Sequence, residues 1–278
     1  MPIRKPRTSK HGRRYNWHPD LPDQRDFLFS EQMTTPLKLP KTVDLRDECP
    51  PVFDQGKIGS CTGNALAAAI DFIELRELGE KKNKTAAKNA VLPEIFGRGG
   101  RFSAVSRLFI YYNERAIEGT VDQDGGAQLR DGIKVLAQFG ACRESLWKYT
   151  ATNVLKKPAT KAFAEAKAHC VSTYMSLRTL DEMKQCLALG FPVVFGFSVY
   201  ESFESPDVAR TGLMPMPEEG ESMLGGHAVM AVGYDDGKEQ LIVRNSWGAK
   251  WGDGGYFRMP YEYVEGLKLA RDFWTVRG

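Results

Sequence analysis

A cysteine at the start of an apolar run is the first residue of this chain that could do covalent chemistry. Cys61 follows a Gly-rich segment and precedes Ala65 to Leu75, a stretch that is apolar on nearly every side and predicts a buried helix. The free N–H groups and the dipole at a helix N-terminus stabilise an anion, so they lower the pKa of a thiol placed there. Cys61 is therefore a candidate nucleophile, although a cysteine at such a position can also be a small core residue.

A histidine and an asparagine further along the chain could complete a nucleophilic site. Of the four histidines, His227 alone leads a β-rich run, and the two glycines before it let other groups approach its ring closely. Asn245 ends the next β-rich run, shortly before Trp247. A cysteine, a histidine and an asparagine can supply a nucleophile, a general base and a group that orients the base.

Three motifs resemble those of the papain family of cysteine peptidases. They are Gln55-Gly56-x-x-Gly59-Ser60-Cys61, then Gly225-Gly226-His227-Ala228-Val229 with Val232-Gly233-Tyr234, and Asn245-Ser246-Trp247-Gly248-x-x-Trp251-Gly252-x-x-Gly255-Tyr256. They stand in the family's order and cover a span from about Lys41 to the C-terminus. Each motif alone could be structural, but the joint pattern makes the chain similar to this family.

The resemblance implies roles in peptide hydrolysis for individual positions. Cys61 would attack the peptide carbonyl as a thiolate paired with the His227 imidazolium, which gives an acyl-enzyme thioester. Asn245 would orient the His227 ring, Trp247 would shield their hydrogen bond from water, and Gln55 would donate its amide to the oxyanion. We expect a cysteine-type endopeptidase. The alternatives are a transamidase or amidase on the same scaffold, or a degenerate peptidase that acts as a binding protein.

The resemblance also implies substrate-binding positions. Asp124-Gly125-Gly126 is similar to the family's glycine pair that binds the substrate backbone, although a plain turn explains these glycines equally well. Small residues would line the pocket for the second residue before the cut, which favours Leu or Phe there. The expected substrate-binding residues are Gly125, Gly126, Gly196, Gly226, Ala228 and Trp247.

Several positions depart from the family pattern. Ile58 stands where the family usually has a cysteine, and the partner position near Gln123 also lacks one, so we expect the family's disulfide to be absent. Thr62 replaces the usual tryptophan after the nucleophile. Gly79 is expected to end the central helix, and the Lys-rich stretch from Glu80 to Arg101 is expected to be an exposed, inserted loop.

The resemblance and the element pattern together predict an α+β protein with the two-lobed papain-like fold. Helical spacing at residues 107–116 and 128–139 indicates a helical lobe, mainly 55–150. Short β-rich runs between residues 192 and 259 indicate an antiparallel, barrel-like β lobe, mainly 170–260. A C-terminal segment would cross back, and the active site would lie in the cleft between the lobes.

Residues 1–42 differ from the peptidase domain expected over residues 43–278. Six Lys or Arg residues fall in the first 14 positions and predict a basic, disordered tail. Tyr15, Trp17, Phe27 and Phe29 follow, and we expect this extended arm to pack on the body. The arm could be structural padding, or a short pro-segment that covers the cleft.

The composition argues against several other classes of protein. Hydrophobic residues make up 42% and charged residues 26%, as in ordinary soluble globular proteins. A net charge of +3 gives no argument for nucleic acid, and no apolar run approaches the roughly 20 residues of a membrane span. We therefore expect a monomer that acts on a protein or peptide substrate, without nucleic-acid or membrane partners. Five scattered cysteines lack metal-site spacing, so no metal or other cofactor is expected. No signal peptide is visible, which leaves the localisation open between the cytoplasm and leaderless secretion.

Overall fold

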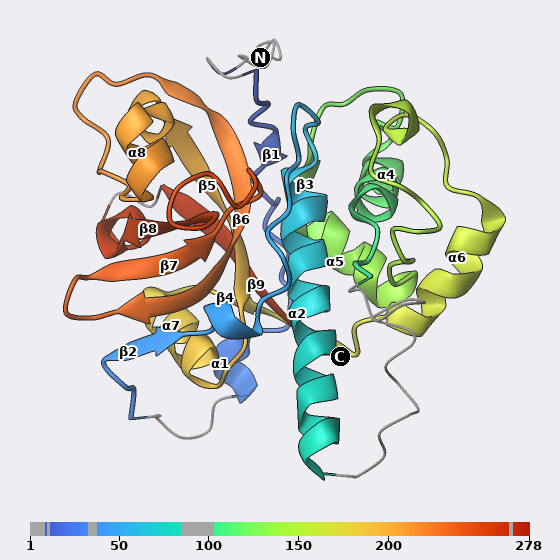
Figure 1. Cartoon of the computed structure of the whole chain (residues 1–278), viewed down its shortest axis with the longest axis horizontal. Helices are drawn as coiled ribbons and strands as arrows, with labels where there is room; N and C mark the ends of the chain where they lie inside the picture. The colour runs from blue at the N-terminus through green and yellow to red at the C-terminus, as the bar shows by residue number, and fades with distance from the viewer. Residues whose placement is uncertain (1–8, 10–11, 33–37, 85–102, 267–268) are drawn as a thin grey trace.

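The structure, a computed structural model, describes residues 9, 12–32, 38–84, 103–266 and 269–278. Its other helices and its strands lie on two sides of one long helix, α2 (Cys61–Lys84) (Figure 1). Helices α4, α5 and α6 lie on one side and an antiparallel sheet lies on the other. This is the α+β architecture that the sequence predicts, with α2 between a helical lobe and a β lobe.

The helical lobe forms where the helical spacing predicts it. Helix α4 (Arg107–Glu118) begins after Ser106, whose side chain accepts a hydrogen bond from the Phe109 N–H at 3.1 Å. It ends at Gly119, which adopts a left-handed conformation with φ of 72°. The other α-helices described are α1 (Phe29–Gln32), α5 (Leu129–Gln138), α6 (Thr160–Ala166), α7 (Leu180–Ala188) and α8 (Pro206–Thr211).

Helix α2 is longer than predicted. Gly79 was expected to end it, but the helix continues to Lys84. One glycine in a helix interior costs only about 1 kcal/mol, and the Glu and Lys residues that follow it are good helix formers. The loop predicted from Glu80 to Arg101 is therefore wrong over residues 80–84, and its remainder lies outside the described residues. No helix among the described residues is both long enough and apolar enough to span a membrane.

The β lobe is one antiparallel sheet. Its strands are β2 (Thr42–Asp44), β4 (Thr173–Leu177), β5 (Val193–Tyr200), β6 (Met223–Asp235), β7 (Gln240–Arg244), β8 (Tyr256–Pro260) and β9 (Ala270–Arg277). The order is β4-β9-β5-β6-β7-β8, and β2 pairs with β6. The end strands β4 and β8 do not pair with each other in the described part of the chain, so the sheet is not a closed barrel. The C-terminal segment supplies β9, which inserts between β4 and β5.

The contact between α2 and the sheet joins the two lobes. The buried face of α2, from Cys61 to Ile73, packs against β6, which carries His227. The burial of these apolar side chains stabilises the interface, so the N-terminus of α2 is held against the middle of the sheet. The same packing determines where a thiol on α2 can meet an imidazole on β6.

Candidate active site

Cys61 lies at the N-terminal end of α2, in the middle of the molecule. It is the first residue of the helix, and its side chain is fully buried. The Ser60 carbonyl accepts hydrogen bonds from the Asn64 N–H at 3.0 Å and from Asn64 Nδ2 at 2.8 Å, which fixes the first turn. The positive end of the helix dipole therefore falls at the thiol, as the sequence predicts.

His227 and Asn245 lie together in the β lobe. His227 Nε2 is 2.9 Å from Asn245 Oδ1, and the Ser246 N–H donates to the same oxygen at 2.8 Å. The bond from the main-chain N–H shows that this atom is the amide oxygen, which can only accept hydrogen bonds. The His227 ring must therefore be the donor, so Nε2 carries the hydrogen. Nδ1 has no hydrogen-bond partner among the described residues. The imidazole therefore keeps its basic nitrogen available, while Cys61 lies against the main chain of Ala228, the next residue.

Aromatic rings frame the imidazole. Trp247 stacks on His227 with ring centroids 5.1 Å apart and an interplanar angle of 25°. Phe197 of β5 meets the ring edge-on at 5.8 Å. These rings exclude water from the bond to Asn245, and a lower local dielectric strengthens that bond.

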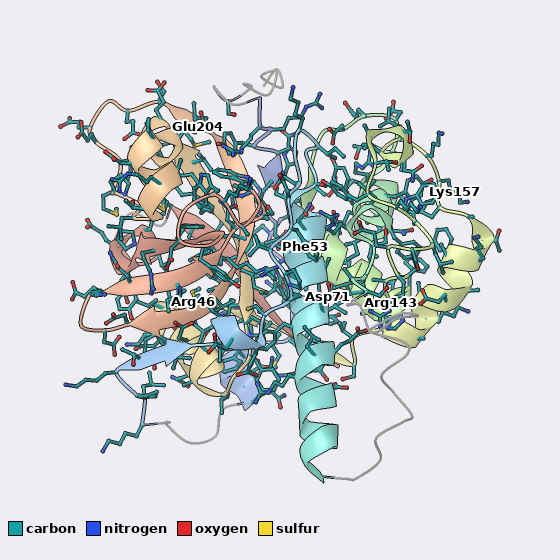
Figure 2. The ribbon with its side chains drawn as sticks, viewed as in Figure 1. Arg46, Phe53, Asp71, Arg143, Lys157 and Glu204 are labelled. Carbon is teal, nitrogen blue, oxygen red and sulfur yellow. The ribbon has the colours of Figure 1, made fainter. Side chains whose placement is uncertain are left out.

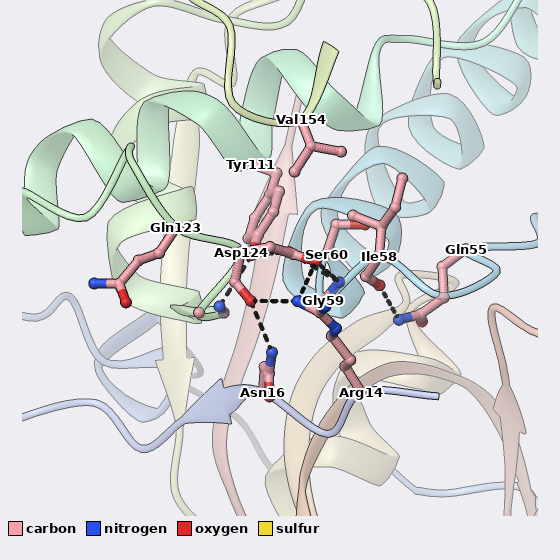
Figure 3. Close-up of polar contacts among 12 residues, drawn as sticks. Arg14, Asn16, Gln55, Ile58, Gly59, Ser60, Tyr111, Gln123, Asp124 and Val154 are labelled. Carbon is pink, nitrogen blue, oxygen red and sulfur yellow. Dashed lines mark hydrogen bonds and ion pairs between the residues drawn. The ribbon is translucent and has the colours of Figure 1, made fainter. Parts of the chain in front are cut away.

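Gln55 is held by the segment that follows Asn245. Its N–H donates to the Ser246 carbonyl at 2.9 Å, and the Ser246 hydroxyl donates to Gln55 Oε1 at 2.5 Å. Gln55 Nε2 donates to the Ile58 carbonyl at 3.0 Å (Figure 3). An amide nitrogen carries two hydrogens, so this bond uses one of them.

The N-terminal arm runs through the same place. The Asn16 main chain contacts the Cys61 thiol, and Asn16 pairs with Gly226 in a short parallel bridge. The Trp17 ring lies directly on Gly196 and Gly226, so closely that a side chain at either position would overlap it. On the side of the helical lobe, β1 (Trp17–His18) pairs in parallel with β3 (Ala127–Gln128). The arm is thus an extended strand between the two lobes (Figure 1).

The preceding arm residues cover the imidazole and the tryptophan beside it. The Tyr15 ring meets His227 edge-on at 6.1 Å and also lies 6.1 Å from Trp247. The Arg13 guanidinium lies 4.1 Å from the Trp247 ring centroid. The Tyr15 hydroxyl donates to Glu204, which lies near α8 (Figure 2).

The charge state expected of Cys61 is wrong for this arrangement. Burial raises the pKa of Cys61 to about 12, although main-chain groups of Ala228, Thr62 and Asn16 act in the opposite direction. Burial likewise lowers the pKa of His227 to about 4. The sequence predicts a thiolate because a helix N-terminus and an imidazole stabilise it, but the arm removes the water that a separated charge pair needs. With the arm in place, both shifts favour a neutral thiol and a neutral imidazole.

The glycine pair contacts the arm. His18 Nε2 is 2.9 Å from the Gly125 carbonyl, and the Asn16 main chain lies directly on the Cα of Gly126. The Gly126 N–H donates to the Tyr111 hydroxyl at 3.0 Å and is therefore directed into the helical lobe. Both glycines therefore lie against the arm.

Sequence reasoning missed the residues that fasten the arm. Glu204 and Asp124 receive side chains of the arm; Glu204 belongs to no motif used to find the site, and Asp124 was given no role beyond its place before the glycine pair. The alternation of Arg13, Tyr15 and Trp17 is the local signal of an extended strand that could have pointed to these contacts. Across the described ranges, no cluster of three His, Cys, Asp or Glu residues could hold a metal ion, and all five cysteines are free.

The chain resembles known cysteine proteases over most of its length. Residues 117–272 match the family model described as papain family cysteine protease. An uncharacterized peptidase C1-like protein of Acanthamoeba polyphaga mimivirus is 39% identical over 97% of this chain and 88% of its own length. Pro-cathepsin H of Medicago truncatula is 28% identical over 81% of this chain, and the match spans 58% of that protein. The crystal structure of xylellain, a cysteine protease from Xylella fastidiosa, aligns with a TM-score of 0.79 and 39% identity, over 100% of this chain and 99% of that chain. The chain belongs to the papain family of cysteine proteases.

Proposed function

We propose that this chain is a cysteine endopeptidase whose N-terminal arm holds it in a closed, neutral state. The observation that carries the proposal is the His227 ring, which bonds to Asn245 through Nε2 and keeps Nδ1 without a partner beside the N-terminus of α2. Residues 43–278 form the peptidase domain, and residues 1–42 act as a short pro-segment.

The reaction begins when the arm leaves and water enters the cleft. His227 Nδ1 takes the proton of the Cys61 thiol, and the resulting thiolate is stabilised by the helix dipole and the imidazolium. The thiolate attacks the peptide carbonyl carbon, and the imidazolium gives its proton to the leaving amine. Water then attacks the thioester with His227 as general base, which releases the acid and restores the thiol.

Two donors stabilise the oxyanion of each tetrahedral intermediate. Gln55 Nε2 has one hydrogen on the Ile58 carbonyl and supplies the other to the oxyanion. The Cys61 main-chain N–H, at the start of α2, supplies the second hydrogen bond. Such preorganised donors are worth about 10²–10³ in kcat each.

The space that the Trp17 side chain occupies, called here the Trp17 seat, is the pocket for the second substrate residue before the cleaved bond. Gly196 and Gly226 lie against the Trp17 ring, Ala228 is the third small residue expected to line the pocket, and the indole Nε1 finds no hydrogen-bond partner among the described residues. A wall without acceptors favours a large apolar side chain such as Leu or Phe. Arg271 pairs with Gly196 in the sheet but its side chain is exposed, so a preference for Glu would show that this residue turns into the pocket.

A panel of fluorogenic dipeptide amides tests the proposal. Trp17→Ala should hydrolyse amides with Leu or Phe at the second position, and Trp17→Ala/Cys61→Ala should not. Added amine acceptor should leave the product mainly the free acid. A product that is mainly the new amide would indicate a transamidase, and no turnover despite an alkylatable Cys61 would indicate a degenerate peptidase.

A further inference from the structure

The Asp124 carboxylate lies at the centre of the polar contacts beside residues 55–60, the segment that precedes Cys61 (Figure 3). The Gly59 N–H is 3.0 Å from Asp124 Oδ1 and 3.1 Å from Oδ2, and the Tyr111 hydroxyl donates to Oδ1 at 2.7 Å. The Asp124 side chain is 16% exposed. Hydrogen bonds to a carboxylate in such a place are about twice as strong as neutral ones.

Tyr111 extends these contacts to the glycine pair. Its ring is fully buried in α4, and its hydroxyl accepts the Gly126 N–H at 3.0 Å while it donates to Asp124. Asp124 is thus linked to Gly126 by the chain and through Tyr111. A shift of the carboxylate would move the strand that the arm pairs with.

The other partner of the carboxylate belongs to the loop that carries the oxyanion donors. Gln55 Nε2 donates to the Ile58 carbonyl, and Gly59 follows directly. We call residues 55–60 the oxyanion loop. The bonds from the Gly59 N–H to Asp124 therefore fix the C-terminal end of this loop. That loop leads straight into the Cys61 N–H, so both donors depend on where Gly59 is held.

The chain lacks a covalent link where the family resemblance would place one. Ile58 occupies one of the two positions, and the other lies near Gln123, the residue before Asp124. The contact from Asp124 to Gly59 joins the same two segments without a disulfide.

The arm uses the same anchor. Arg14 Nη1 lies 2.9 Å from Asp124 Oδ2, and Asn16 Nδ2 donates to the Asp124 carbonyl at 3.2 Å. Arg14 Nη1 also donates to the Asp124 carbonyl at 3.2 Å. Of the two carboxylate oxygens, Arg14 contacts Oδ2 and Tyr111 contacts Oδ1, so loss of Arg14 leaves the Tyr111 bond in place.

We infer that Asp124 is a positioning residue for the reaction, which ties the oxyanion loop to the glycine pair in place of a disulfide, and that it also anchors the arm through Arg14. This rests on the proposed function, because the loop matters only if an oxyanion forms. The two roles separate by substitution. Asp124→Asn keeps an oxygen for Gly59 and Tyr111 but loses the charge that Arg14 needs, whereas Asp124→Ala loses both.

The test compares two reactions of the full-length chain. Alkylation of Cys61 by iodoacetamide needs access and a thiolate but forms no oxyanion, whereas amide hydrolysis needs all three. Arg14→Ala should speed both reactions relative to the wild type, and Asp124→Asn should match it within about threefold. Asp124→Ala should match Arg14→Ala in alkylation but show a kcat about 10- to 100-fold lower, because the oxyanion donors are misplaced. Equal kcat for Asp124→Ala and Arg14→Ala would overturn the positioning role.

Two further measurements keep the inference testable if Asp124→Ala does not fold. Tyr111→Phe removes the hydroxyl that joins Gly126 to Asp124 but leaves the bonds from Gly59 to the Asp124 carboxylate, so it should raise KM with little change in kcat, and an unchanged KM would overturn the coupling. If no variant hydrolyses amides, the proposed function fails by itself. The positioning role is then measured by the affinity for a peptide aldehyde, whose thiohemiacetal oxygen needs the same donors. Asp124→Ala should weaken that affinity relative to Asp124→Asn, and equal affinities would overturn the inference.

Discussion

The Tyr15 hydroxyl donates a 2.5 Å hydrogen bond to the Glu204 carboxylate, and this contact fastens the arm to the β lobe beside His227. Both side chains are buried. The ring that closes the imidazole off from water is therefore the same ring that holds the arm in place.

Removal of that hydrogen bond should loosen the arm. Tyr15→Phe keeps the ring on His227 but leaves the buried Glu204 without the phenol donor, and a hydrogen bond to a charged group contributes about 1.5–3 kcal/mol. We expect the rate of Cys61 alkylation to rise by about 10-fold or more, measured by iodoacetamide labelling and peptide mass mapping. Tyr112→Phe, at a half-buried tyrosine of α4, is the matched control and should leave the rate unchanged. Equal rates for both variants would contradict this role of Tyr15.

The order in which the cysteines react should report the state of the arm. In the resting chain, Cys61 is buried with its pKa raised to about 12, whereas Cys170 is exposed. Iodoacetamide at pH 6 should therefore label Cys170 before Cys61 in the wild type. In Trp17→Ala, the order should reverse, because the thiolate pair with His227 can form. Adding His227→Ala should abolish that reversal, and a Cys61 rate indifferent to His227 would refute the ion pair.

Docking of the arm should weaken as the pH rises towards neutrality. Asp272 accepts the Asp20 N–H of the arm at 2.7 Å, and burial, followed by the Asp20 charge, raises the pKa of Asp272 to about 7. Arg130 and Arg271 act against this rise. The docked state binds the Asp272 proton more tightly than the open state, where its pKa is about 3.9. Docking is therefore strongest below about pH 4 and loses this contribution between pH 4 and 7.

Asp272→Asn isolates this effect. Asparagine still accepts the Asp20 N–H and tolerates the positive φ of 58° at this position, but it does not titrate. The ratio of the wild-type to the variant alkylation rate of Cys61 should rise between pH 5 and 7 and level off by pH 8. A ratio that stays constant across this range would show that Asp272 does not control the arm.

Two substitutions in the Trp17 seat should both increase access of reagents to Cys61, but only one of them should increase amide hydrolysis. Trp17→Ala empties the pocket, whereas Gly196→Val places a side chain where the indole lies. Loss of a buried aromatic contact of about 1.5–3 kcal/mol should speed alkylation of Cys61 about 10- to 150-fold in both. Hydrolysis of amides with Phe at the second position should rise only in Trp17→Ala. Leu21→Ala, at an arm residue 72% exposed, should change neither, and efficient Phe cleavage by Gly196→Val would place the pocket elsewhere.

The sequence alone was enough to predict the architecture and the elements that position Cys61, His227 and Asn245. The apolar run after Cys61 predicts a buried helix with the thiol at its N-terminus, and the β-rich runs around His227 and Asn245 predict adjacent strands. These predictions hold because local periodicity and residue type determine such elements. The end of α2 was missed because a single glycine is a weak stop signal when its neighbours favour a helix.

Only the tertiary structure decided the protonation state of the site and the path of the arm. The helix N-terminus argues for a thiolate, but the burial of Cys61 in the folded chain outweighs it, because desolvation depends on what covers a group and not on its place in a helix. The contacts of Asp124 with Gly59 and Arg14 join segments distant in the chain. No local pattern encodes such contacts, since they exist only once the two lobes and the arm have packed together.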